Sequence, residues 1–311
     1  MAETKQIKYS FIIPVVSETF HLKNLLESIG IQKFDNNQFE FIFVITENVN
    51  FDEVEQLISS FRNNRPDIRV QLLSFEGKAL LEARNYGITH AEGDILIFVE
   101  DDIIFEKDYF KFLVEDTRNL QGAFAGGGKI IPVFEQQKPP WMIKFFMPLL
   151  AEVNLKEKYK IFPKKLYPFG INMLVHKEIL QHTGVFDPTP ETNHGPEHIM
   201  TSEKQFIDKV RKAGFPVYYF GNLLVWNYIP AEQATRSYIR KQAEIHLQVE
   251  IENAKEKGKI KFGRFLVKEQ LKFIGAIGIG LYYLLTTQWE KLRSLFQYRY
   301  WSYKIIAKNI R

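Results

Sequence analysis

The sequence contains no cysteine among its 311 residues. Disulfide bonds and thiolate metal sites are therefore excluded, and a reducing compartment fits this composition. Residues 1–5 lead into the first apolar segment without a hydrophobic leader, so we do not expect a secreted protein. Glycine is missing from residues 14–19, directly after that segment. This argues against a sugar-phosphate nucleotidylyltransferase, which would carry a glycine-rich phosphate loop there.

One uncharged segment near the C-terminus bears on membrane attachment. Residues 273–289 carry no charge over 17 residues, at the lower edge of what spans a bilayer, and three glycines weaken a lone helix. Lys268, Lys272, Lys291 and Arg293 flank this segment, an arrangement typical of helices in the headgroup layer of a membrane. Three interpretations stay open: attachment to a membrane surface, a true span, and a buried helix or oligomer contact.

The net charge of +4 conceals an asymmetry between the two ends of the chain. Residues 231–311 carry 16 lysines and arginines against 7 acidic residues, a net charge of +9, which leaves −5 for residues 1–230. The basic residues alternate with long apolar runs, and we find no nucleic-acid-binding motif. We therefore expect no nucleic-acid partner, and we treat residues 231–311 as a basic, helical extension.

Apolar segments alternate with segments of helical periodicity along the first 120 residues. Such alternation predicts right-handed βαβ crossovers, hence an α/β fold with a mainly parallel sheet flanked by helices. We expect Gly126, Gly127 and Gly128 to form a loop, and residues 141–150 to form a flap or a packing segment. The expected strands are 7–16, 39–45, 70–74 and 94–99, and the expected helices are 21–29, 52–61, 80–91 and 107–120.

Three carboxylates, Glu100, Asp101 and Asp102, follow the last of these strands. In open α/β sheets ligands bind outside the carboxyl ends of the strands, so this is where a ligand would meet concentrated negative charge. Oxygen ligands of this kind suit Mg²⁺ or Mn²⁺, which take the rest of their shell from water and substrate phosphates. An exposed acidic turn without function is the alternative.

The order of motifs around the triplet resembles the family-2 glycosyltransferases of GT-A fold, in which the triplet is the DxD motif. The resemblance runs from about residue 7 to about residue 250. It rests on Ala83-Arg84-Asn85, Gly87-Ile88, Ala91-Glu92-Gly93-Asp94, the strand ending near Pro14, Gly170-Ile171-Asn172-Met173, Gly184-Val185-Phe186-Asp187, and Ser202-Glu203 followed by Ala213-Gly214.

The resemblance implies a catalytic domain over residues 1–230 that transfers a sugar, with inversion, from a nucleotide-sugar donor to a glycan or lipid-linked acceptor. Glu203 would be the general base, at the start of a helix over 202–213 that Thr201 or Ser202 caps, although acidic residues there also serve stability alone. The implied metal ligands are Asp102, Glu100 and Asn227, for Mg²⁺ or Mn²⁺. The implied donor-binding residues are Pro14, Thr46, Glu47, Arg84, Asn85 and Asp101. For Arg84 and Asn85, helix capping or a salt bridge is the alternative.

The chain departs from the family pattern at three places. Thr46 and Glu47 stand where an aspartate usually holds the nucleotide base, Ser202-Glu203 replaces an acidic pair, and Asn227 replaces a histidine. These departures motivate an alternative, a catalytically inactive relative that binds a sugar nucleotide or a partner protein. Gly195-Pro196 indicates a loop around His194 and His198. We expect a cytoplasmic protein, with peripheral attachment to the inner face of the cell membrane as one interpretation of the tail.

Overall fold

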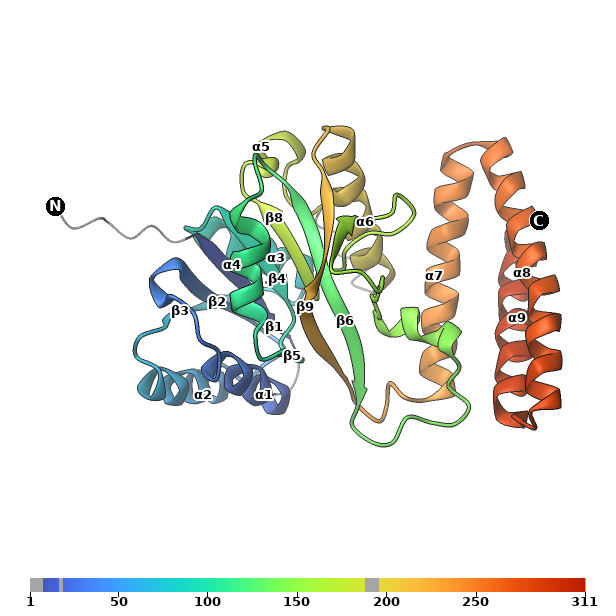
Figure 1. Cartoon of the computed structure of the whole chain (residues 1–311), viewed down its shortest axis with the longest axis horizontal. Helices are drawn as coiled ribbons and strands as arrows, with labels where there is room; N and C mark the ends of the chain where they lie inside the picture. The colour runs from blue at the N-terminus through green and yellow to red at the C-terminus, as the bar shows by residue number, and fades with distance from the viewer. Residues whose placement is uncertain (1–7, 17–18, 188–195, 311) are drawn as a thin grey trace. The chain divides into compact units, whose positions relative to one another are not determined.

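The computed structural model describes residues 8–16, 19–187 and 196–310 (Figure 1). The chain divides into two compact units. The first comprises Met1–Ile131 and Val153–Tyr228, and the second comprises Pro132–Glu152 and Ile229–Arg311. Residues 132–152 thus belong to the same unit as the C-terminal helices. The sequence alone had indicated one boundary, at residue 230.

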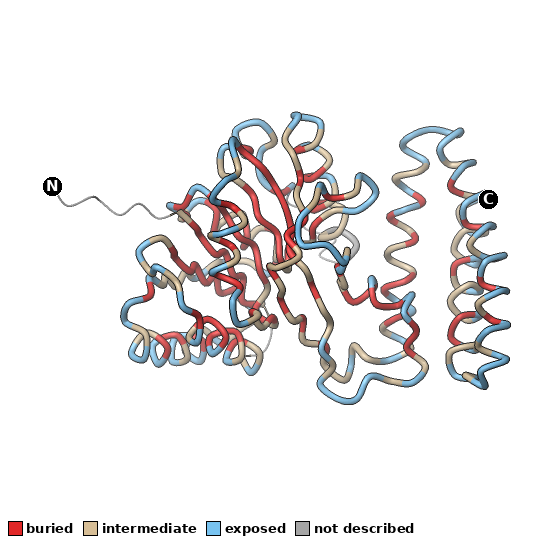
Figure 2. The backbone as a smooth tube through the Cα atoms, in the orientation of Figure 1, coloured by how far each residue is buried: buried red, intermediate tan, exposed pale blue. Residues whose placement is uncertain are grey.

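Four parallel strands form one half of the sheet, in the order β3-β2-β1-β4. The residues of β1, β2 and β4 are mostly apolar and all buried (Figure 2), as expected for strands covered on both faces, whereas those of β3 are partly exposed. Each predicted strand and helix of this half is confirmed to within a few residues. The elements are β1 (Tyr9–Val15), α1 (Thr19–Gly30), η1 (Asn36–Gln38), β2 (Phe39–Thr46), α2 (Phe51–Asn64), β3 (Arg69–Phe75), α3 (Leu80–His90), β4 (Ile95–Val99) and α4 (Tyr109–Arg118).

The other half of the sheet is antiparallel, so the sheet as a whole is mixed. β8 pairs with β4, β6 pairs with β8, and β9 pairs with both β5 and β7. The α/β class with flanking helices and a helical C-terminal region is confirmed. These elements are β5 (Ile103–Phe105), β6 (Ala125–Phe134), β7 (Tyr159–Ile161), β8 (Asn172–His176), α5 (Ile179–Thr183), α6 (Pro196–Lys212) and β9 (Val217–Ile229).

The expected loop at Gly126–Gly128 was wrong, because all three glycines lie inside β6. A Cβ at Gly128 would overlap the amide of Asn172 and the carbonyl of Leu223. The same Asn172 amide donates to the Leu223 carbonyl oxygen at 2.8 Å, and its oxygen accepts from the Tyr109 hydroxyl at 2.7 Å. Glycine is therefore required here by close packing between strands, not by a turn.

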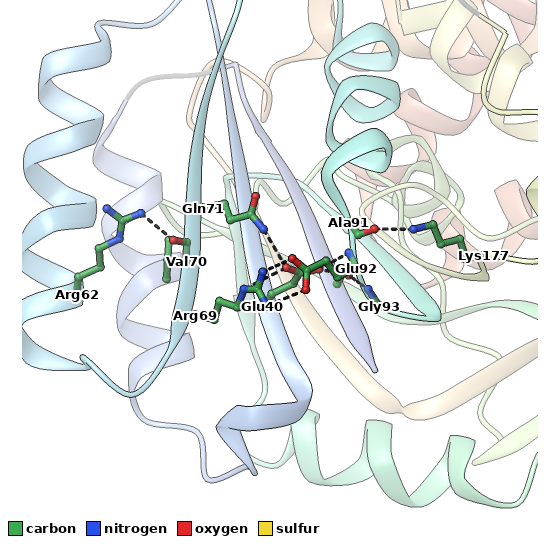
Figure 3. Close-up of polar contacts among 10 residues, drawn as sticks. Glu40, Arg62, Arg69, Val70, Gln71, Ala91, Glu92, Gly93 and Lys177 are labelled. Atoms are coloured by element: carbon green, nitrogen blue, oxygen red, sulfur yellow. Dashed lines mark hydrogen bonds and ion pairs between the residues drawn. The ribbon is translucent and has the colours of Figure 1, made fainter. Parts of the chain in front are cut away.

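A buried carboxylate, Glu40, ties together the amino ends of the parallel strands (Figure 3). Its oxygens accept from the Ser10 hydroxyl at 2.6 Å, the Glu92 amide at 2.6 Å and the Gln71 side chain at 3.0 Å. Arg69 contributes the cation, with its Nε 3.6 Å from Glu40. Because the acidic triplet follows the carboxyl end of β4, Glu40 lies at the opposite edge of the sheet and serves stability.

The second unit contains α7 (Arg236–Glu256), α8 (Lys259–Leu285), α9 (Trp289–Ile310) and η2 (Lys144–Leu150). Phe146 and Leu150 of η2 share a buried cluster with Ile239 of α7, Ala276 of α8 and Leu295 of α9. The expected segment 141–150 therefore packs among the C-terminal helices. Within the described residues, none of the helices combines the length and hydropathy needed to cross a bilayer.

His246 in α7 gives this unit a pH-dependent stability. Burial lowers its pKa from 6.5 to about 4, so the folded state disfavours the protonated ring. The contribution of His246 to the free energy of unfolding is fully present above about pH 6.5 and is lost as the pH falls from 6.5 toward 4. We expect the free energy of unfolding to drop by on the order of 2 kcal/mol between about pH 7.5 and about pH 5 through this group. Urea titrations of His246→Gln should lose that part of the drop; an unchanged drop contradicts the assignment.

Candidate active site

Asp102 presents an oxygen that lacks a partner at the end of β4. Its backbone carbonyl accepts from the Tyr228 amide of β9 at 3.2 Å, which fixes the backbone. Its side-chain Oδ1, however, is buried and has no hydrogen-bond partner among the residues that the structure describes. Burial, followed by the charges of Glu100 and Asp101, raises the pKa of Asp102 well above its ordinary value. A carboxylate in this situation is stabilised by a cation.

Asp101 follows the carboxyl end of β4, and the residues expected to bind the donor base, Thr46 and Glu47, lie at the carboxyl end of β2. Asp101 is buried, and its Oδ2 accepts from the Val16 amide at 2.9 Å. The Thr46 hydroxyl donates to the Val15 carbonyl at 3.1 Å, and Glu47 beside it is exposed. Pro14 is a buried residue of β1 paired with Val44. The structure therefore brings these residues to the same sheet edge as the triplet.

Arg84 joins two carboxylates that are far apart in the sequence. It is fully buried in α3, where its Nη1 donates to Glu203 Oε1 at 2.6 Å and its Nη2 donates to Glu100 Oε1 at 3.0 Å. Both Nη nitrogens are thus engaged by carboxylates, which is the salt bridge that the sequence left open beside a donor contact. Arg84, Glu100 and Glu203 form what we call the Arg84 bridge.

Burial dominates the electrostatics of the Arg84 bridge. It raises the pKa of Glu100 to about 7 against the opposing charge of Arg84, and Glu203 and Asp101 add to the rise. It raises the pKa of Glu203 as well, again against Arg84 and against the Gly170 amide, which donates to Glu203 Oε1 at 3.1 Å. A carboxylate with a raised pKa is a stronger base, which is the property that general base catalysis needs.

The helix that carries Glu203 begins earlier than the sequence indicated. α6 starts at Pro196, a residue well suited to a first helical position. The expected capping by Thr201 or Ser202 and the placement of Glu203 in the first turn were therefore wrong. Ser202 instead donates its hydroxyl to the Asp187 carbonyl at 3.1 Å. His198 is helical rather than in a loop, while its side chain and the whole of His194 lie outside the described residues.

Two further expected residues, Asn227 and Asn85, are sequence neighbours of Tyr228 and Arg84. Asn227 is buried in β9 opposite Ile103, next to the Tyr228 that bonds the Asp102 carbonyl. The Asn85 amide donates to the Phe186 carbonyl at 2.8 Å, and its Oδ1 is buried without a partner. Asn85 thus fastens α3 to the 184–187 segment.

Sequence reasoning missed His21, in the first turn of α1. Its ring lies 4.6 Å from the ring of Tyr228, and within the described parts of the chain its buried Nδ1 has no hydrogen-bond partner. Only its position directly after the first strand could have pointed to it.

Gly170 leaves room for the Arg84 guanidinium, because a Cβ at this position would overlap it. We expect Gly170→Ala to displace Arg84, to cost about 1–3 kcal/mol of stability, and to slow turnover. Gly263→Ala, an exposed helical position with open space around the added methyl, is the control and should gain about 0.5–1 kcal/mol. Thermal unfolding and turnover of both variants test this; equal behaviour contradicts the packing argument.

Residues 10–184 match the profile described as "Glycosyl transferase family 2". The chain belongs to glycosyl transferase family 2. The match spans more than half of the chain and includes the triplet and Arg84. The resemblance noted from the motifs is thereby confirmed.

A characterised relative is the poly(ribitol-phosphate) beta-N-acetylglucosaminyltransferase TarS of Staphylococcus aureus. The two are 25% identical over 165 residues, which cover 52% of this chain and 27% of TarS. The chain therefore spans about a quarter of the length of that relative.

Solved structures show the same fold. The mannosyltransferase PcManGT of Pyrobaculum calidifontis, in complex with GDP-Man and Mn²⁺, gives a TM-score of 0.56 at 14% identity and covers 94% of this chain and 74% of its own. A TarS structure in complex with UDP-GlcNAc gives 0.51 at 15% identity, covering 78% of this chain and 65% of that chain. These likenesses establish the GT-A fold.

The candidate metal ligands offer a divalent cation only part of its coordination shell. Asp102 offers a buried oxygen without a partner, Glu100 is its carboxylate neighbour, and Asn227 is one residue from Tyr228. Among the residues that the structure describes, no group of three or more His, Asp or Glu side chains could hold a metal ion alone. A Mg²⁺ or Mn²⁺ ion with one or two carboxylates normally completes its shell with water and substrate phosphates. The residues present fit that mode of binding.

Proposed function

We propose that this glycosyltransferase inverts the anomeric centre as it moves a sugar from a nucleotide donor to a glycan or lipid-linked acceptor, on the cytoplasmic side of the cell membrane. The proposal rests above all on the Arg84 bridge, in which one buried guanidinium holds both Glu203 and Glu100, two residues before Asp102. The acid expected to act as base is thereby linked to the acids expected to face the donor.

The hydrogen bonds of Glu203 indicate which of its two carboxylate oxygens would act as the general base. Oε1 accepts from Arg84 and from the Gly170 amide. Within the described part of the chain, Oε2 has no hydrogen-bond partner. Oε2 is therefore the oxygen that would take the proton of the acceptor hydroxyl as that hydroxyl attacks the anomeric carbon. Arg84 and Gly170 hold the carboxylate in place, and its raised pKa favours proton uptake.

The donor side would be formed by the sheet edge around the triplet. Asp102, Glu100 and Asn227 would hold Mg²⁺ or Mn²⁺, which neutralises charge on the departing diphosphate. Asp101, fixed by the Val16 amide, would face the ribose or sugar, and Thr46 or Glu47 would meet the base. The complexes of PcManGT with GDP-Man and Mn²⁺ and of TarS with UDP-GlcNAc support a nucleotide-sugar donor and a divalent cation.

A turnover screen tests the proposal. The full chain is incubated with UDP- and GDP-linked sugars and Mn²⁺, and release of the nucleoside diphosphate is measured with and without EDTA. We expect release with at least one donor, and loss of release with EDTA. Tight nucleotide binding without any turnover would instead favour the inactive relative that the departures at Thr46, Ser202 and Asn227 suggested.

A further inference from the structure

Helix α8 packs through a face that is partly polar. The residues turned into the second unit include Phe265, Glu269, Ala276 and Gly280, all of them buried. Glu269 is the acidic member of this face, where Lys272 pairs with it and Arg299 lies 3.8 Å away. The inward face thus contains a neutralised ion cluster among its apolar contacts.

The opposite face of α8 is mostly apolar, although Arg264 lies on the same side of the helix as Ile260 and Val267. Six large side chains recur at intervals of three, four or seven residues, which places them on one side of a helix. Each is between 55% and 82% exposed, and exposed residues recur along this helix in Figure 2. We call them the α8 stripe: Ile260, Val267, Leu271, Ile274, Leu281 and Leu285.

An apolar stripe of this length is normally shielded from water by protein or by lipid. Monomeric soluble proteins rarely expose long contiguous apolar patches, and a helix that is apolar on both faces is normally buried in protein or in lipid. Beyond Lys272 the sequence of α8 has no charge at all, so its C-terminal half offers water only apolar side chains and glycines on its exposed face.

The charges on α8 favour a lipid surface over a second copy of the chain as the group that contacts the α8 stripe. The exposed ionic residues of α8 are all cations, Lys259, Lys261, Arg264 and Lys268, and the single acid in its sequence, Glu269, faces inward. A second copy of α8 would bring cations but no exposed carboxylate to meet them. A lipid surface with anionic headgroups supplies negative charge to every cation and an apolar layer to the stripe.

Aromatic side chains at the end of α8 agree with this choice. Tyr282 and Trp289 are both exposed, the first in the last turn of α8 and the second at the start of α9. Tyr and Trp favour the headgroup layer because one end of each ring is apolar and the other is polar.

We propose that α8 lies in the surface of a membrane rich in anionic lipid, with the α8 stripe in the acyl boundary and its lysines and arginine against the headgroups. This inference goes beyond the proposed transfer reaction and does not depend on it. It would place the enzyme where a lipid-linked acceptor is presented.

Vesicle flotation of the full chain tests the docking surface. We expect binding to vesicles of phosphatidylcholine with phosphatidylglycerol, weaker binding to phosphatidylcholine alone, and weakening by salt. The triple variant Leu271→Ser, Ile274→Ser and Leu281→Ser should bind at least about tenfold less. The matched control replaces two exposed apolar residues of the first unit, Ile161→Ser with Leu166→Ser, and should bind like the wild type.

Charge and oligomeric state provide the remaining outcomes. Lys261→Glu with Lys268→Glu should weaken binding to the anionic vesicles and leave binding to phosphatidylcholine unchanged. Equal flotation of the wild type and the triple variant overturns the proposal, as does absence of flotation with any vesicle. A dimer in sedimentation equilibrium that the triple variant abolishes, without vesicle binding, identifies a second copy as the cover.

Turnover measured without vesicles separates this proposal from the transfer reaction. The triple variant should keep wild-type donor turnover in solution, because none of its three positions belongs to the active site. Lost or absent turnover with intact flotation would count against the proposed function and leave the docking surface standing.

Discussion

Asp102→Asn is expected to reduce metal-dependent sugar transfer by at least about a thousandfold, because loss of metal stabilisation of the leaving diphosphate is worth several kcal/mol. The substitution keeps the shape of the side chain and removes its charge. The buried Oδ1 without a partner and the raised pKa indicate that the ionised carboxylate is unfavourable in the folded chain without a cation. The metal-free variant should therefore unfold at a temperature no lower than the wild type does.

Asp94→Asn is the matched control, since Asp94 is exposed and directly precedes β4, at the end opposite to Asp102. Its turnover and its response to Mn²⁺ should equal those of the wild type. The combination of lost turnover and retained stability in Asp102→Asn is specific to a cation site. Retained turnover, or loss of turnover that merely accompanies unfolding, would contradict the assignment.

Glu203→Gln should lower kcat by about a hundredfold to ten-thousandfold, the usual contribution of a general base. Glutamine keeps an oxygen that can accept from Arg84 and Gly170, so the fold should persist, while its amide cannot take the acceptor proton. Because Glu203 would act in the chemical step, the affinity for the donor nucleotide should change little. Steady-state kinetics and nucleotide titration separate the two effects.

Glu40→Gln provides the control, because Glu40 is also buried, also lies near an arginine, and lies at the amino ends of the strands. It should lower the free energy of unfolding and leave kcat unchanged. A Glu203→Gln enzyme with normal kcat would remove Glu203 from the mechanism. Loss of nucleotide binding in the same variant would assign it a structural role in place of a catalytic one.

The parallel half of the fold could be predicted from the sequence because its signals are local. Strands such as Ile95–Val99 are continuous apolar runs, and the helices between the strands carry apolar residues at helical spacing. The end of β4 is likewise visible, since the apolar run stops at three carboxylates. The position of the acidic triplet follows from those two local facts.

The rest of the site depends on contacts between distant residues and could not be predicted. Arg84 read alone suggests a phosphate ligand, and only the fold reveals Glu100 and Glu203 on either side of its guanidinium. Gly126–Gly128 read alone suggest a turn, whereas Asn172 and Leu223 exclude larger side chains inside a strand. The start of α6 was misplaced because Gly195-Pro196 signals a loop and a helix start equally well.

The central claim is that the carboxyl end of β4 binds a divalent cation together with a nucleoside diphosphate. Calorimetric titration of Mn²⁺ into the full chain, with and without UDP or GDP, tests it most directly. We predict that one of the nucleotides strengthens Mn²⁺ binding in the wild type and in Asp94→Asn, and that Asp102→Asn loses this binding. Mn²⁺ binding that is equal in Asp102→Asn and the wild type would contradict the account.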